Sequence, residues 1–168
     1  MRIEEKNGNL TIIDFNEFEA DKIACKIEKD GIHFYKKLQG KVKQDEIRQA
    51  LGFLIKEEEK HLKIFQDSLF ALEEKKGVIS DEDTLLDAID YGIYQPYQNL
   101  SELENILDKP DKALKLGLVI EEKSINFYKA CIQQLSNETV KNEISNIIEE
   151  EYRHKQLLEG LLENLPKG

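Results

Sequence analysis

Apolar residues recur every three or four positions along four long stretches of the chain, and charged residues fill most positions between them. This spacing is typical of amphipathic helices, each with one apolar face that packs into a core. The predicted helices run from Asn16 or Asp14 to about Gln39, over roughly 43–75, from Pro110 to about Leu135, and from the break at Ser136-Asn137 to about Leu165. Four such helices predict an all-α fold, an antiparallel four-helix bundle.

The first predicted helix carries recognisable end signals. Asp14 with Glu17, or Asn16 with Glu19, offers a capping box, in which two side chains bind free backbone amides of the first turn. Gly40 is expected to end this helix in a left-handed conformation, which glycine adopts without steric penalty.

The remaining segments connect or precede the helices within one expected domain, 1–168. Residues 1–13 are polar and then briefly β-branched, which predicts an arm or a short extended lead. Residues 77–109 form a long connection in which Asp81–Tyr91 resembles a short amphipathic helix. A connection of this length can cross the whole bundle, which gives an up-down-down-up topology. It could also let hairpins exchange between two chains, so we expect a homodimer, with hairpin swapping as one form of it.

Two Glu-x-x-His motifs, at 58–61 and 151–154, interrupt the apolar faces. Each follows a single helical glutamate by 30 residues, and a shift of 93 residues carries one set onto the other. The midpoints of the two glutamate pairs, residue 43 and Ser136, both lie at predicted breaks, so each hairpin brings its glutamates level. The six candidate ligands are Glu28, Glu58, His61, Glu121, Glu151 and His154.

Four carboxylates and two imidazoles on inward faces predict a dinuclear metal site. Buried carboxylates without partners are costly and repel one another, and no lysine or arginine lies on these faces to balance them. Two divalent cations would neutralise the carboxylates and bind both imidazoles. This donor set suits iron, manganese or zinc, and a redox function would favour iron.

The alternative is coincidence, because the chain is rich in glutamate and a single Glu-x-x-His would carry little weight. Agreement of six residues in type, spacing, face and turn position favours the metal site. The neighbouring glutamates are predicted to be ordinary solvated residues: Glu57, Glu59, Glu122, Glu149 and Glu150.

Other residues near the motifs have weaker assignments. Tyr35 and Tyr128 each follow a candidate glutamate by seven residues, so both could donate hydrogen bonds to ligand carboxylates across the bundle. The alternative role for both is that of core aromatics. His33 lies off the ligand face and is predicted to be a surface histidine. Cys25 is expected to be a packing residue.

Composition narrows the function classes. The chain has 168 residues and a formal net charge of −10, which argues against a nucleic-acid partner. The sequence has no apolar run of membrane-spanning length and no expected signal peptide, so a cytoplasmic location without membrane contact is expected. Cys25 and Cys131 are far apart and no Cys-x-x-Cys occurs, which excludes a rubredoxin-type centre in this sequence.

The motifs resemble those of the rubrerythrin-type branch of the ferritin-like diiron-carboxylate family, over roughly residues 17–162. The similarity is carried by Ile27-Glu28-x-x-Gly31-x-x-Phe34-Tyr35, Glu58-x-x-His61, Glu121-x-x-Ser124-x-x-Phe127-Tyr128 and Glu151-x-x-His154. The resemblance implies a ferritin-like bundle with two iron ions. It also implies that Glu58 and Glu151 bridge the metals, that Glu28 and Glu121 are terminal ligands, and that each histidine binds one metal.

The chain departs from the family pattern in two ways. Ser124 stands where typical rubrerythrins carry an additional carboxylate, and no rubredoxin domain is present. The ligand set is nearer the symmetrical four-Glu, two-His site of bacterioferritin, although few residues follow His154 for the fifth helix of a cage-forming ferritin.

The resemblance implies a diiron oxidoreductase, a peroxidase or oxidase, that reduces hydrogen peroxide or oxygen. Its electrons would come from a small external electron-transfer protein such as a rubredoxin-like carrier. Two alternatives are kept: a non-cage ferroxidase or iron-handling protein, and a structural module whose metals only hold the hairpins together.

Overall fold

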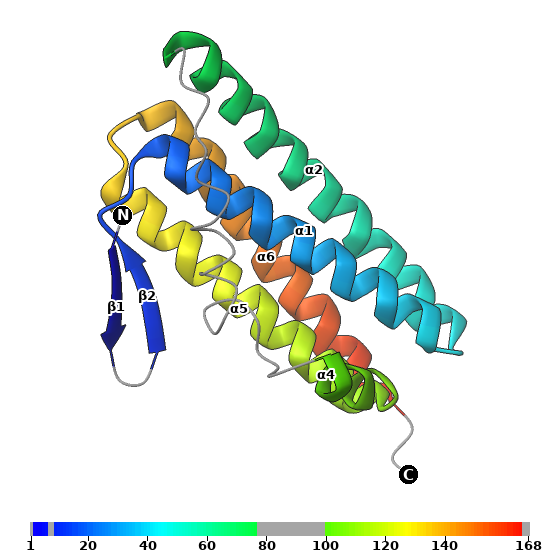
Figure 1. Cartoon of the computed structure of the whole chain (residues 1–168). Coiled ribbons are helices and arrows are strands. Elements are labelled where there is room, and N and C mark those ends of the chain that lie inside the picture. The colour runs from blue at the N-terminus through cyan, green and yellow to red at the C-terminus, as the bar shows by residue number, and fades with distance from the viewer. Residues whose placement is uncertain (1, 7–8, 77–99, 166–168) are drawn as a thin grey trace.

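The computed structural model describes residues 2–6, 9–76 and 100–165. Its elements are β1 (Arg2–Lys6), β2 (Asn9–Ile13), α1 (Glu17–Lys41), α2 (Asp45–Lys76), α4 (Leu100–Leu107), α5 (Pro110–Gln134) and α6 (Glu138–Glu163). Four long helices form the bundle, and the strands form a separate hairpin beside one end of it (Figure 1). None of the helices in these ranges is both long and apolar enough to cross a membrane.

The four long helices have the predicted up-down-down-up topology. Helices α1 and α2 form one antiparallel hairpin, and α5 and α6 form the other (Figure 1). Between the hairpins, Tyr35 contacts Glu121 while Glu28 contacts Tyr128, so residue numbers rise along α1 as they fall along α5. This antiparallel crossing confirms the predicted all-α four-helix bundle.

Helix α1 starts at the second of the two predicted capping boxes. Asn16 Oδ1 accepts a hydrogen bond from the Glu19 amide at 3.0 Å, and Glu19 Oε2 accepts one from the Asn16 amide at 2.9 Å. Asp14 lies outside the helix with a left-handed φ of 57°, which turns the chain from β2 into the helix.

The predicted left-handed stop at Gly40 is wrong. Helix α1 continues through Gly40 and ends at Lys41, and the residue after it, Val42, is extended. The Val42 side chain is only 6% exposed, so core packing rather than a glycine turn ends the helix here.

The described part of the connection between the hairpins, residues 100–109, contains a helix that the sequence analysis did not predict. The helix predicted at 81–91 lies outside the described residues. Helix α4 was not predicted; it packs Leu103 and Leu107 into the core, each 1% exposed. Lys41 of α1 forms ion pairs of 2.7 Å with Glu104 and Asp108 at this corner. The extended lead predicted near the N-terminus is one strand of the antiparallel pair β1–β2.

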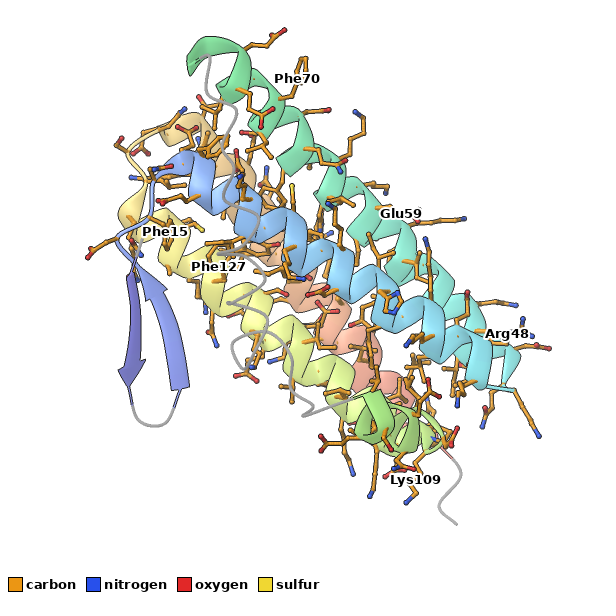
Figure 2. All side chains as sticks on the ribbon, in the orientation of Figure 1. Phe15, Arg48, Glu59, Phe70, Lys109 and Phe127 are labelled. Carbon is orange, nitrogen blue, oxygen red and sulfur yellow. The ribbon has the colours of Figure 1, made fainter. Side chains whose placement is uncertain are left out.

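Two apolar clusters fill the bundle on either side of its middle. One lies near the start of α1 and contains Phe15 and Phe127, whose ring centroids are 5.6 Å apart (Figure 2). The other lies near the end of α1 and includes Leu38, Leu54 and Leu114. The six candidate ligands lie between these clusters and are shielded from water by both.

Asp21 is a buried carboxylic acid in the first of these regions. It is 3% exposed, and its Oδ2 has no hydrogen-bond partner among the residues that the structure describes. Burial raises the pKa of Asp21 to about 7, against the opposing effect of a hydrogen bond with Ser68. The folded state therefore favours the protonated acid more than the unfolded chain does.

We expect Asp21→Asn to stabilise the protein more as pH rises. A raised folded-state pKa leaves the native protein holding more protons than the unfolded chain between about pH 4 and 7, so wild-type stability falls across that interval. The advantage of the variant, measured by urea unfolding, should grow by about 2 kcal/mol between pH 5 and pH 8. Asp67→Asn, at an exposed ion pair with Lys63, is the matched control and should show no such growth. A constant difference for Asp21→Asn would contradict the expectation.

Candidate metal centre

The six candidate ligands meet in the middle of the bundle. They come from α1 (Glu28), α2 (Glu58, His61), α5 (Glu121) and α6 (Glu151, His154), and all six residues are only 1–3% exposed. Every residue that the sequence predicted as a ligand is thus brought to one place.

The ligand atoms divide into two groups of four. One contains Glu28, Glu58, His61 and Glu151, and the other contains Glu58, Glu121, Glu151 and His154. Within each group the donor atoms lie within 4.8 Å of one another, so each group could hold a cation. Glu58 and Glu151 belong to both.

The two shared carboxylates point one oxygen at each half. Glu58 Oε2 lies 3.2 Å from His61 Nδ1, and Glu58 Oε1 lies 3.3 Å from His154 Nδ1. Glu151 Oε2 lies 3.0 Å from His154 Nδ1, and Glu151 Oε1 lies 3.5 Å from His61 Nδ1. A carboxylate that bridges two ions presents its oxygens in this way.

The outer carboxylates, Glu28 and Glu121, each serve one half. Glu28 Oε2 is 3.8 Å from His61 Nδ1, and Glu121 Oε2 is 3.8 Å from His154 Nδ1. Their remaining oxygens accept hydrogen bonds across the bundle, Glu28 from Tyr128 and Glu121 from Tyr35. Both tyrosines are 0% exposed and make the hydrogen bonds considered for them, so they orient the two outer carboxylates.

Without metal, the site offsets the negative charge of its carboxylates by taking up protons. Burial, with the charges of the shared glutamates, raises the pKa of both Glu28 and Glu121. Burial alone would lower the pKa of the imidazoles, but hydrogen bonds with buried carboxylates raise it to about 10 for His61 and about 12 for His154. The same two imidazoles outweigh the burial of Glu58 and lower its pKa.

These donors fit two divalent cations. Four carboxylates carry the charge that two such ions neutralise, and each half supplies one imidazole nitrogen with oxygens around it. Cations would replace the protons that the imidazoles hold, so metal binding should release protons. The donor chemistry is compatible with iron and does not by itself select it.

Most neighbouring glutamates are exposed, as predicted. Glu59 lies on α2 (Figure 2) and pairs with Lys36 of α1 at the surface, at 2.8 Å. Glu122 and Glu149 are also exposed. Glu57 is not, contrary to the prediction: its side chain is 16% exposed and pairs with Lys60.

The prediction for Glu150 is wrong. Its Oε2 lies 2.7 Å from His61 Nε2, and its side chain is 36% exposed, so it contacts a buried candidate ligand. Sequence spacing gave no sign of this contact, because Glu150 is next to Glu151 on a helix already rich in glutamate.

Four further positions bear on the chemistry. Ser124 is buried, and its hydroxyl donates to the Ile120 carbonyl at 3.2 Å, so it adds no acidic ligand. His33 is exposed, as predicted. Cys25 and Cys131 are buried free thiols, which confirms the packing role expected for Cys25.

We expect Tyr128→Phe and Tyr35→Phe to weaken metal binding without abolishing it. Each removes one hydrogen bond that orients an outer carboxylate, and such losses typically lower metal affinity by roughly tenfold or more. Competition with a chromophoric chelator measures the change. Tyr152→Phe is the control, since Tyr152 is 42% exposed and its hydroxyl binds Lys129 rather than the site. Unchanged affinity in both buried variants would show that these tyrosines are only core aromatics.

Comparisons with known proteins agree with this geometry. The family model described as Rubrerythrin matches residues 17–109, which include Glu28, Glu58 and His61. A crystal structure from Thermotoga maritima, provisionally described as that of a ferritin-like diiron-carboxylate protein, has a TM-score of 0.69 and 19% sequence identity. It covers 93% of this chain and 100% of that chain, and at this identity it establishes the fold. No curated protein is significantly similar in sequence.

Proposed function

The chain belongs to the rubrerythrin family, and from this premise we propose that it is a diiron oxidoreductase that reduces hydrogen peroxide or oxygen. One observation carries the proposal: Glu58 and Glu151 each direct one oxygen to each of two adjoining four-residue donor groups. Two metals held so close could act together on one small oxidant.

We assign the six candidate ligands by their positions. Glu58 and Glu151 would each bind both metals. Glu28 with His61, and Glu121 with His154, would complete the two halves. Two bound ferrous ions would supply the two electrons that, with two protons, convert hydrogen peroxide to two water molecules.

The chain itself contributes two tyrosine hydroxyls beside the site and an apolar surround that keeps water out of it. Burial together with neighbouring carboxylates raises the pKa of Tyr35 and Tyr128 well above the ordinary value, so both hydroxyls remain protonated beside the site. The two apolar clusters exclude bulk water from the site. Exclusion of water would limit side reactions, such as the escape of a reactive oxidant into solvent.

Electrons must reach the site from outside the chain under this proposal. The sequence has two cysteines, both buried and neither in a Cys-x-x-Cys motif, so it offers no iron-sulfur centre. A small electron-transfer protein, such as a rubredoxin-like carrier, would therefore re-reduce the irons. We also retain the homodimer, hairpin-swapped or not, as a proposal.

Stopped-flow oxidation of the ferrous-loaded protein tests the reaction. We expect hydrogen peroxide, or oxygen, to oxidise the bound iron much faster than free ferrous iron in the same buffer. Oxidation at the rate of free iron would contradict the proposed activity. Glu59→Ala is the control variant, since Glu59 is exposed and should leave the rate unchanged.

A second function, non-cage ferroxidase or iron handling, is favoured by one observation. Ser124 binds the Ile120 carbonyl and adds no extra carboxylate, which leaves the symmetrical four-Glu, two-His set. Iron that stays bound after oxidation indicates a cofactor, whereas iron that leaves indicates a substrate. A purely structural module predicts that zinc stabilises the fold as well as iron does, with no oxidation chemistry.

A further inference from the structure

Glu150 binds the outward nitrogen of one candidate ligand. His61 directs Nδ1 at the carboxylates of the site, 3.2 Å from Glu58 Oε2. Its other ring nitrogen, Nε2, lies 2.7 Å from Glu150 Oε2. Since His61 is 1% exposed while Glu150 is 36% exposed, the carboxylate connects a buried imidazole with the surface of α6.

This contact has a defined consequence for metal binding. A neutral imidazole that binds a metal through Nδ1 must carry its proton on Nε2. A carboxylate that accepts a hydrogen bond from Nε2–H fixes that tautomer, holds the ring in position and makes Nδ1 a stronger donor. Once a cation replaces the proton on Nδ1, Glu150 would hold His61 in the tautomer that the cation requires.

Among the described residues, the other half of the site shows no equivalent contact. The shift of 93 residues that relates the two motifs carries Glu57 onto Glu150 and His61 onto His154. Glu57 pairs with Lys60 instead. In the part of the chain that the structure describes, neither Glu57 nor any other residue hydrogen-bonds Nε2 of His154. The ligand set is symmetrical, but its outer support is not.

We propose that Glu150 is a positioning residue for His61 and makes the half formed by Glu28, Glu58, His61 and Glu151 the tighter of two divalent-cation sites. The two cations then bind in order, first beside His61 and then beside His154. The inference rests on the proposed metal centre but not on its reaction with peroxide or oxygen.

Titration with cobalt(II) tests the order of binding. We expect two resolved steps in the wild-type calorimetric and visible-absorption titrations. In Glu150→Ala the affinity of the first step should fall by about tenfold to 100-fold, with the second step little changed. Glu150→Gln keeps an acceptor and should recover part of the loss. Glu57→Ala is the matched control at the related position and should leave both steps unchanged.

NMR of the imidazole nitrogens separates the contact from the metal centre. In the zinc-loaded wild type, His61 should show a protonated Nε2 that exchanges slowly with solvent, and Glu150→Ala should lose this protection. An unchanged first binding step in Glu150→Ala, or an equal loss in Glu57→Ala, would overturn the inference while leaving the metal centre intact. Absence of any cobalt binding by the wild type would overturn the metal centre itself, and the inference with it.

Discussion

Alanine at Glu58 or Glu151 is expected to abolish retention of both metals, whereas alanine at Glu28 or Glu121 should remove about one. The two shared glutamates contribute an oxygen to each donor group, and the outer glutamates contribute to one group each. Loss of a shared carboxylate therefore weakens both sites at once. It also removes a negative charge from between the two cations, so that they repel each other more strongly.

Metal content after loading and desalting, measured by mass spectrometry, checks this difference. Glu59→Ala is the control, because Glu59 is exposed, pairs with Lys36 and lies one position from Glu58. Equal metal loss across the four buried variants would contradict the bridging assignment, even if all four lose some metal.

Metal loading is expected to stabilise the fold strongly. In the metal-free protein the buried carboxylates are balanced only by protons on their neighbours, and the pKa of His61 and of His154 rises to about 10 and about 12 as a result. At a free metal concentration 1,000 times the dissociation constant, one site adds about 4 kcal/mol to the free energy of unfolding. Two filled sites should therefore shift the thermal midpoint by well over 10 °C.

Calorimetry of loaded and metal-free protein measures this shift. The gain should shrink as pH falls, because protons compete with metal for both imidazoles. Glu58→Ala should show little gain and Glu59→Ala the full gain. An identical thermal midpoint with and without metal in the wild type would contradict the account.

The ligand residues were predictable from sequence because their signal is repeated. Glu58 and Glu151 each precede a histidine by three positions on an apolar face, and the 93-residue shift relates both sets. Local chemistry also predicted the Asn16–Glu19 capping box, since that interaction involves only one turn of helix.

Features decided by tertiary packing were missed. Burial of Val42 carries α1 past Gly40, and a local glycine rule cannot anticipate it. The contact of Glu150 with His61 depends on the register of α6 against α2, which no pattern within one helix encodes. The β1–β2 pairing did have a sequence signal, the dipeptide Asn7-Gly8 followed by the short alternating run Leu10-Thr11-Ile12, because Asn-Gly is typical of hairpins.

The most direct test of the central claim is an iron count after anaerobic loading with ferrous iron and removal of unbound metal. We expect about two irons per chain, one for each donor group. A wild-type protein that retains no iron would contradict it, because the buried carboxylates would then be balanced by protons alone.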